Sequence, residues 1–123
     1  MQISGHYAGF PEKTLVVILN HERARIFRAH GHDFTEEPEL HAEGETIGNT
    51  HALNAFFALV VTHMEHILQK NTAKEFLICV PEIYRVQFHQ VIPTALHKHI
   101  KRTVPKNLTA MEEGPIIRIL FEG

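Results

Sequence analysis

The segment Thr50–Lys70, THALNAFFALVVTHMEHILQK, predicts the long helix around which the rest of the chain folds. Its apolar residues recur at intervals of three and four, which is the spacing of one broad face of an α-helix. Asn49 or Thr50 can cap the first turn, and Lys70 and Asn71 close the last one. The short apolar strands on either side need a face of this width to pack against. The face consists of Leu53, Phe56, Phe57, Val60, Met64, Ile67 and Leu68.

Two uninterrupted apolar runs, Leu15–Leu19 and Phe76–Val80, flank this helix in the sequence. Such runs are typical of strands that are covered on both faces. A strand, a long helix and a second buried strand form a crossover unit, so we expect the two strands to be parallel. Arg23–Ala29 predicts the return arm of a hairpin with the first run. Phe34–Ala42 is polar and interrupted by Pro38, which suits an edge strand at most.

The remaining segments are shorter. Met1–Lys13 has no periodicity and predicts an irregular lead-in. Glu82–Val91 predicts a helix, and Pro93 breaks it so that Thr94–Ile100 forms a separate turn. Lys101–Val104 predicts a short last strand of the sheet.

The tail of the chain supports two interpretations. Thr109 and Glu112 have the spacing of a capping box, which predicts one helical turn. Ile116–Phe121 is strongly β-forming and predicts a strand, covered either by the chain's own sheet or by a second copy of the protein. The second case is a structural homodimer, and its contact residues are Ile116, Ile117, Ile119 and Phe121.

Composition limits the classes of function. The chain has 123 residues, 44% hydrophobic and 21% charged, which is typical of one soluble globular domain over residues 1–123. The formal charge of −2 gives no overall attraction to nucleic acid, although it allows a local basic patch. Met1–Lys13 does not resemble a signal peptide, and no apolar run approaches the roughly 20 residues of a membrane span. We therefore expect a cytoplasmic protein without membrane association. Cys79, the only cysteine, lies in an apolar run and predicts a buried thiol.

Three pieces of the sequence carry a resemblance to a known family. They are Arg23–Phe27 (RARIF) after the first buried run, Phe76–Pro81 (FLICVP) with the helix up to Pro93, and Lys106–Thr109 (KNLT). In this order they resemble the bacterial host-attachment protein family, whose members are similar to the middle domain of eukaryotic and archaeal peptide-chain release factors. A strand-like tail departs from that pattern, which has a helix there.

The resemblance implies a fold and, by analogy, a process. The fold is an α/β, three-layer, ribonuclease-H-like mixed five-stranded sheet flanked by helices. An antiparallel hairpin and an edge strand are followed by two parallel strands. The process is translation, and the implied partners are ribosomes or RNA. Fold alone does not determine function.

Two activities of related folds require residues that this chain lacks. Peptidyl-tRNA hydrolysis by release factors depends on a Gly-Gly-Gln loop, and the chain has no two adjacent glycines. Ribonuclease-H-type hydrolysis needs several carboxylates converging from the first strand and its parallel neighbour. Leu15–Leu19 contains none, and Asp33 is the only aspartate. We expect neither activity and no cofactor.

One basic cluster is a candidate RNA- or phosphate-binding surface. Cations near a helix C-terminus are also favoured by the helix dipole, which is the alternative explanation. No RNA-stacking motif accompanies the cluster. Its residues are His97, Lys98, His99, Lys101, Arg102 and Lys106.

A candidate ligand site lies at the carboxyl edge of the two parallel strands. Asn20 and His21 follow the first strand, and Glu82 and Tyr84 follow the second. Open α/β sheets often bind ligands at such an edge, and His with Glu can perform acid–base chemistry. Arg23 and Arg25 could contact an anion from the hairpin. Each of these residues also has an ordinary role as a turn former, a helix-terminal acid or a surface charge.

Two histidines suggest a metal-binding hypothesis. His63 and His66 are three residues apart on the long helix and could share one face. A structural zinc site needs about four ligands, and no Cys–His spacing here matches one. We favour solvated or hydrogen-bonded histidines and expect no metal.

These observations leave three functional hypotheses. The first is a non-catalytic binding protein associated with ribosomes or RNA. The second is a small enzyme or sensor that binds a phosphorylated or anionic ligand at the carboxyl edge. The third is the structural homodimer.

Overall fold

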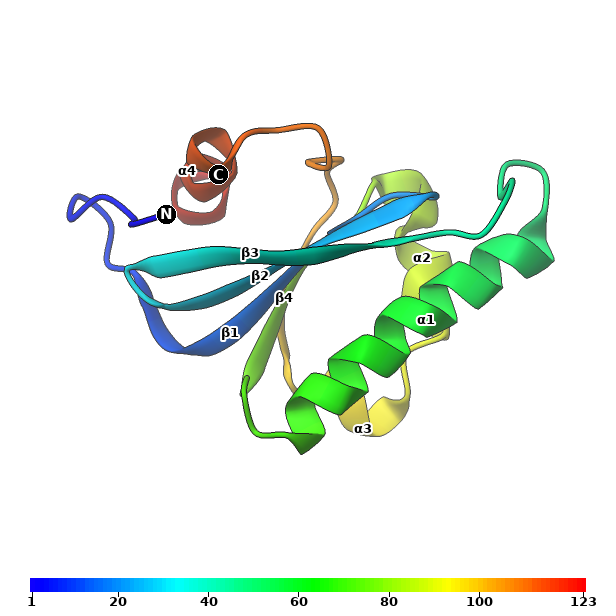
Figure 1. Ribbon diagram of the computed structural model, residues 1–123, viewed down its shortest axis with the longest axis horizontal. Coiled ribbons are helices and arrows are strands. Elements are labelled where there is room, and N and C mark those ends of the chain that lie inside the picture. The colour runs from blue at the N-terminus through cyan, green and yellow to red at the C-terminus, as the bar shows by residue number, and fades with distance from the viewer.

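A mixed sheet of five strands forms the middle layer of the protein in the computed structural model, which describes residues 1–123 (Figure 1). The spatial order is β3-β2-β1-β4-β5. β1, β2 and β3 are antiparallel neighbours, whereas β4 and β5 run parallel to β1. This arrangement confirms the predicted fold class. The strands are β1 (Phe10–Leu19), β2 (Arg23–Gly31), β3 (Asp33–His41), β4 (Glu75–Cys79) and β5 (Ile100–Val104).

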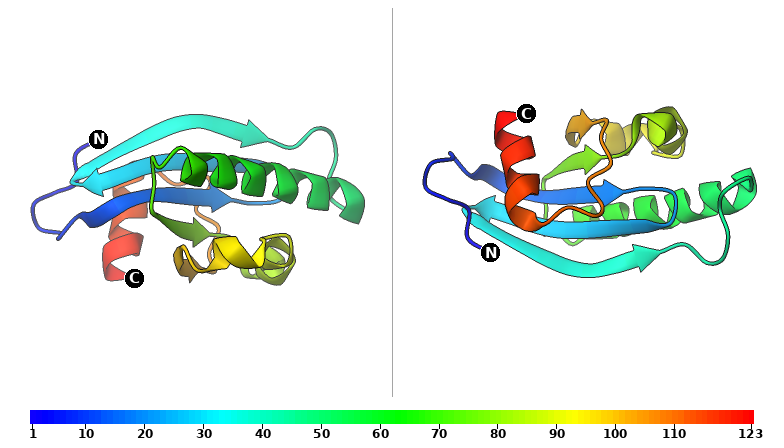
Figure 2. Two further views of the ribbon diagram at one scale, coloured as in Figure 1. Left: turned by 90° about the horizontal axis from the view of Figure 1, so that it is seen from below. Right: turned by 90° about the horizontal axis from the view of Figure 1, so that it is seen from above.

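Helices cover both faces of this sheet (Figure 2). α1 (Thr50–Gln69), α2 (Glu82–Gln90) and α3 (Thr94–His97) lie on one face, and α4 (Glu113–Glu122) lies on the other. Each face has its own apolar cluster, so the molecule has three layers. The predicted break between two helices at Pro93 is confirmed.

The central strand explains why its sequence is continuously apolar. All five residues of Leu15–Leu19 are fully buried. Leu15, Val17 and Leu19 pack in the cluster beneath α1, whereas Val16 and Ile18 pack in the cluster beneath α4. A strand with helices on both faces has no polar side, as its sequence predicted.

The long helix α1 forms as its sequence predicts. Asn49 caps it, since the Oδ1 atom accepts a hydrogen bond from the amide of Ala52 at 3.0 Å. The buried face includes six of the seven predicted residues, and Leu68 is half-buried. After Lys70, Asn71 adopts a left-handed conformation (φ 58°) that turns the chain back toward β4.

The tail corrects two sequence predictions. Glu113–Glu122 is a helix, not a strand, and no helical turn begins at Thr109. Pro115 fits in the first turn of α4, where backbone amides have no intrahelical partner. Ile116, Ile117 and Leu120 share one face and bury it against the sheet. The second face of the sheet needs a cover, and this tertiary demand overrides the β-propensity of isoleucine and phenylalanine.

The same helix changes the homodimer hypothesis. Ile116 and Ile117 are buried in the chain's own core, and Ile119 and Phe121 pack against its margin. A dimer made by pairing these residues as strands is therefore wrong.

The predicted irregular lead-in, Met1–Lys13, also needs correction, because β1 begins at Phe10 and Ile3 is buried.

Candidate functional site

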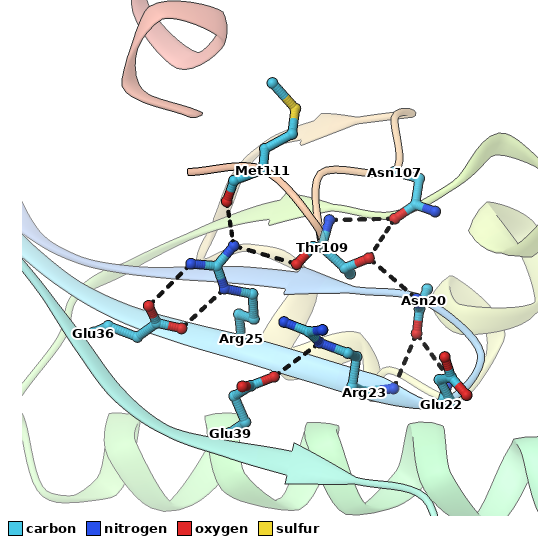
Figure 3. Close-up of polar contacts among 9 residues, drawn as sticks. All are labelled: Asn20, Glu22, Arg23, Arg25, Glu36, Glu39, Asn107, Thr109 and Met111. Atoms are coloured by element: carbon cyan, nitrogen blue, oxygen red, sulfur yellow. Dashed lines mark hydrogen bonds and ion pairs between the residues drawn. The ribbon is translucent and has the colours of Figure 1, made fainter. Parts of the chain in front are cut away.

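Asn20 follows β1 directly and organises the carboxyl edge of the sheet. Its Oδ1 atom accepts hydrogen bonds from the amides of Glu22 (2.9 Å) and Arg23 (3.0 Å), which fixes the hairpin turn. Its Nδ2 atom donates to the Oγ1 atom of Thr109 at 3.1 Å (Figure 3). Asn20 is buried, so the contact links β1 to the segment between β5 and α4.

Arg25 is the centre of this polar network. It is only 8% exposed, and its Nε and Nη2 atoms donate to both carboxylate oxygens of Glu36 at 2.9 and 3.0 Å. Its Nη1 atom donates to the carbonyl oxygens of Thr109 (3.3 Å) and Met111 (2.5 Å) (Figure 3). Hydrogen bonding to Glu36 raises the pKa of Arg25. Because its donors are used internally, Arg25 holds the β5–α4 segment on the sheet and is not free to bind a ligand.

Two pieces of sequence that are far apart meet in this network. Arg25 belongs to the RARIF piece and Thr109 to the KNLT piece. Asn107 supports the contact, since its Oδ1 atom accepts hydrogen bonds from both the amide and the hydroxyl of Thr109. Sequence reasoning singled out both pieces but did not predict that they touch. It also missed Glu36, which carries no local signal of its role.

His21, Glu82 and Tyr84 lie toward the opposite face of the sheet, whereas Arg23 is on the same face of β2 as Arg25. The ring of His21 lies 5.9 Å from the ring of Tyr84, which packs against the α1 cluster. Glu82 is exposed and accepts two hydrogen bonds from Arg85, which lower its pKa. Arg23 pairs with Glu39 on β3 at 2.8 Å. The six predicted residues therefore form separate pairs and do not converge on one ligand.

The carboxyl edge also has an unfavourable charge for an anion. We define this edge as residues 20–25, 39–49, 82–85 and 105–113, which surround the carboxyl ends of β1, β4 and β5. It contains seven glutamates and four Lys or Arg residues. Excess negative charge repels an anionic ligand. Its glutamates are Glu22, Glu39, Glu43, Glu45, Glu82, Glu112 and Glu113.

The predicted basic cluster divides between the two ends of β5. Lys98 lies two residues before this strand and Lys106 lies two residues after it, so the strand separates them by its length. Lys98, His99 and Lys101 line one hollow of 360 Å³, together with Lys74 and two glutamates. Lys98, His99 and Lys101 therefore share one surface, whereas Lys106 lies at the acidic carboxyl edge.

The other two members of the cluster have internal partners. Arg102 donates from Nη1 to the carbonyl oxygen of Leu120 at 2.9 Å, which satisfies the C-terminal end of α4. The ring of His97 stacks on the ring of His89 with centroids 5.7 Å apart. Desolvation, with a smaller effect of His97, lowers the pKa of His89.

The histidine pair of α1 lies in ordinary surroundings. His63 is half-buried in a hollow beside Arg28 and Glu37, and desolvation lowers its pKa. His66 is exposed. Nowhere in residues 1–123 do three or more His, Cys, Asp or Glu side chains gather closely enough to hold a metal ion.

Two further features bear on the class of protein. Cys79 is buried, and desolvation raises the pKa of its thiol to about 12, so it is not a thiolate nucleophile at neutral pH. None of the helices combines the length and apolar character that crossing a bilayer requires.

Comparison with solved structures gives the fold a context. No protein-family model matches the chain, and no curated protein matches it by sequence. The fold is similar to that of the Pelota protein of Thermoplasma acidophilum, with a TM-score of 0.62 over 95% of this chain and 33% of that one, at 16% identity. The archaeal translation termination factor aRF1 gives a TM-score of 0.59 over 74% of this chain and 29% of that one, at 15% identity. The fold is release-factor-like.

Two more neighbours show the range of proteins with this fold. Ribosome-bound archaeal Pelota, in a model with ABCE1, gives a TM-score of 0.57 over 86% of this chain and 33% of that one, at 10% identity. The Ppx/GppA phosphatase of Aquifex aeolicus gives 0.51 over 76% of this chain and 35% of that one, at 8% identity. The chain spans about a third of the length of these proteins. These likenesses concern the fold alone.

Proposed function

We propose that this chain is a non-catalytic, release-factor-like protein of the cytoplasm that binds ribosomes. The observation that carries the proposal is the similarity to Pelota, which extends over 95% of the chain. Neighbours with the same fold are described as a translation termination factor and as a ribosome-bound protein. Within this proposal, RNA contacts come from Lys98, His99 and Lys101, which share one hollow.

Membership of the bacterial host-attachment family is a further part of the proposal. The support is the contact between two of the three pieces that carry the resemblance. Arg25 of the RARIF piece donates to the carbonyl oxygen of Thr109 in the KNLT piece. The two pieces therefore act together in the fold of this chain.

A binding role agrees with how the polar residues are used. Arg25 and Glu82 are engaged by Glu36 and Arg85 respectively. The thiol of Cys79 is buried and protonated at neutral pH. The chain also has no Gly-Gly-Gln loop. Binding through surface charge requires none of the groups that acid–base or nucleophilic catalysis would need.

Co-sedimentation with ribosomes tests the proposal. Purified protein is mixed with purified ribosomes and separated on sucrose gradients at low and at moderate salt. We expect comigration with ribosomes at both salts, with a smaller bound fraction at moderate salt. Dissociating the ribosomes with EDTA should move the protein to the subunit fractions. Protein that stays at the top of every gradient would overturn the proposal.

The second candidate is a sensor or enzyme for a phosphorylated ligand at the carboxyl edge. The similarity to the Ppx/GppA phosphatase favours it, whereas the separation of the edge residues and the excess of glutamates do not. Thermal unfolding with inorganic phosphate and pyrophosphate tests this candidate. A rise in Tm that is lost in His21→Ala and Arg23→Ala would support it, and an unchanged Tm would exclude these two ligands.

A further inference from the structure

We propose that the amino edge of the sheet is the RNA-contacting surface of the protein, and that the acidic carboxyl edge faces away from RNA. This inference rests on the proposed ribosome binding and assigns it to one side of the molecule. We define the amino edge as residues 9–14, 28–33, 66–75 and 93–102, which surround the amino ends of β1, β4 and β5 and the β2–β3 turn. It contains seven Lys or Arg residues and three acidic residues. Its cations are Lys13, Arg28, Lys70, Lys74, Lys98, Lys101 and Arg102.

The polarity of charge along the strands is the first argument. The chain has a formal charge of −2, yet its Lys and Arg residues predominate at one end of the sheet and its glutamates at the other. Figure 1 shows that the parallel strands β1 and β4 point toward the same end, so the two edges lie on opposite sides of the molecule. A polyanion is attracted to one edge and repelled by the other, which fixes the orientation of the encounter.

The amino edge is continuous across four neighbouring strands. The amide of Lys74 donates to the carbonyl oxygen of Lys13 at 2.8 Å, and the amide of Phe76 donates to that of His99 at 2.8 Å. These bonds join the starts of β1, β4 and β5, and β2 lies on the other side of β1. With strands spaced about 4.8 Å apart, the edge from β2 to β5 is about 15 Å wide.

Two hollows lie along this edge and carry the cations. One has a volume of 380 Å³ and is lined by residues that include Lys13, Arg28 and His30. The other, of about 360 Å³, is lined by Lys74, Lys98, Lys101 and His99 together with Glu12 and Glu75, so its cations outnumber its carboxylates. The hollows contain few apolar side chains, which suits phosphate and sugar contacts rather than an apolar ligand.

Five of these seven charges are available to a ligand, whereas Arg28 is paired with Glu37 and Arg102 donates to the carbonyl oxygen of Leu120. Lys13, Lys70 and Lys98 are exposed and make no ion pair. Lys74 lies 3.8 Å from Glu12 in an exposed pair, a kind that contributes little and exchanges readily. Lys101 is exposed and lies 3.7 Å from the half-buried Glu75. Such cations can turn to a phosphate without breaking the fold.

The helix dipole does not explain this concentration of charge. It favours Lys70 and Lys98, which follow the last turns of α1 and α3. It does not act on Lys13, Arg28 or Lys101, which lie on strands. These cations lie at the same edge of the sheet, although they belong to helix ends and to strands. A common ligand requires such a shared location and does not depend on the type of secondary structure.

The strand β5 provides a matched pair of test positions. Lys98 lies two residues before it at the amino edge, and Lys106 lies two residues after it at the carboxyl edge. Both side chains are exposed, neither has an ion pair, and the substitutions Lys98→Glu and Lys106→Glu change charge equally. Lys98→Glu therefore alters the charge of the amino edge, and Lys106→Glu alters the charge of the carboxyl edge. Circular dichroism and Tm confirm that each is folded, and Lys13→Glu replaces Lys98→Glu if the latter is unstable.

Fluorescence anisotropy with a fluorescein-labelled single-stranded oligouridylate measures the effect as a function of salt. For Lys98→Glu we expect roughly tenfold weaker binding and a log–log salt slope smaller by about 0.7, the value for one lost phosphate contact on a single strand. Lys106→Glu should stay within about twofold of the wild-type chain, since it removes no contact. Equal losses in the two variants, or a larger loss in Lys106→Glu, would overturn the assignment of the edge.

Ribosome gradients with the same variants separate this inference from the proposed function. If the wild-type chain comigrates and only Lys106→Glu is released, ribosome binding holds and the edge assignment is wrong. If the wild-type chain does not comigrate but binds oligouridylate through Lys98, the edge assignment holds and the proposed function is wrong.

Discussion

Arg25 shows how a charged residue can serve the fold and not a ligand. Its position after a hairpin turn made it a candidate anion contact in the sequence. In the structure its guanidinium is buried over the ring of Phe27 and bonded to Glu36, Thr109 and Met111. The sequence could not predict this role, because the partners on the β5–α4 segment lie more than 80 residues away.

Removing Arg25 should destabilise the protein strongly. Arg25→Ala leaves the carboxylate of Glu36 and two backbone carbonyls without their partner, and we expect a loss of about 2–4 kcal/mol in the free energy of unfolding. Urea denaturation followed by circular dichroism measures it. The control is Arg28→Ala on the same strand, whose side chain is exposed and whose pair with Glu37 should contribute under about 1 kcal/mol. Similar losses in both variants would contradict the anchoring role of Arg25.

Two half-buried histidines predict how stability depends on pH. Desolvation lowers the pKa of both His63 and His89 below the ordinary value of 6.5. Between the folded and unfolded pKa values the unfolded chain binds more protons, so acidification through pH 6.5 should reduce the free energy of unfolding. The double variant His63→Gln/His89→Gln should show a shallower loss over the same pH range in urea titrations. An identical pH profile for the variant and the wild-type chain would contradict this account.

At the scale of elements, α4 shows where local propensity fails. The sequence predicted α1, the buried part of β1, β4 and the break at Pro93 correctly, because the apolar pattern of each segment matches its burial. Ile116–Phe121 has the local character of a strand. Tertiary packing favours the helix, because its face of Ile116, Ile117 and Leu120 covers the face of the sheet that α1 leaves open. The spacing of these three residues also fits one face of a helix, so periodicity and β-propensity disagree in this tail and periodicity indicates the observed element.

Truncating the core side chains of α4 should destabilise the monomer. Ile116 is fully buried, and Ile116→Ala should cost about 2–4 kcal/mol in the free energy of unfolding, from lost burial and the cavity left behind. Ile119→Ala is the control, because Ile119 is only half-buried and should cost about half as much or less. Urea denaturation measures both. If Ile116→Ala costs no more than Ile119→Ala, the packing of α4 on the sheet is not as described.

At the scale of the whole molecule, the amino and carboxyl edges of the sheet differ in charge, although the same strands form both. Sequence reasoning found the β5 cations but treated Lys98 and Lys106 as members of one cluster. Topology separates them, because β5 runs between them from the amino edge to the carboxyl edge. It also brings Lys13 and Lys74 to the amino edge, although they are distant from Lys98 in the sequence. Which charged residues meet at an edge depends on the order of the strands in the sheet. Counting charges along the sequence does not give that order.

Because the basic edge is one surface, its effect on ribosome binding should depend on salt as well as on position. We expect the fraction of wild-type protein that comigrates with ribosomes to fall as salt rises, and to fall at lower salt for Lys13→Glu. Gradients run over a series of salt concentrations measure both curves. Superimposable curves would mean that Lys13 contacts no phosphate.

The most direct test of the account is one set of sucrose gradients with purified ribosomes at low salt, loaded with the wild-type chain, Lys98→Glu or Lys106→Glu. Ribosome binding through the amino edge should let the wild-type chain and Lys106→Glu comigrate with ribosomes and release most of Lys98→Glu. Absence of the wild-type chain from the ribosome fractions would contradict it.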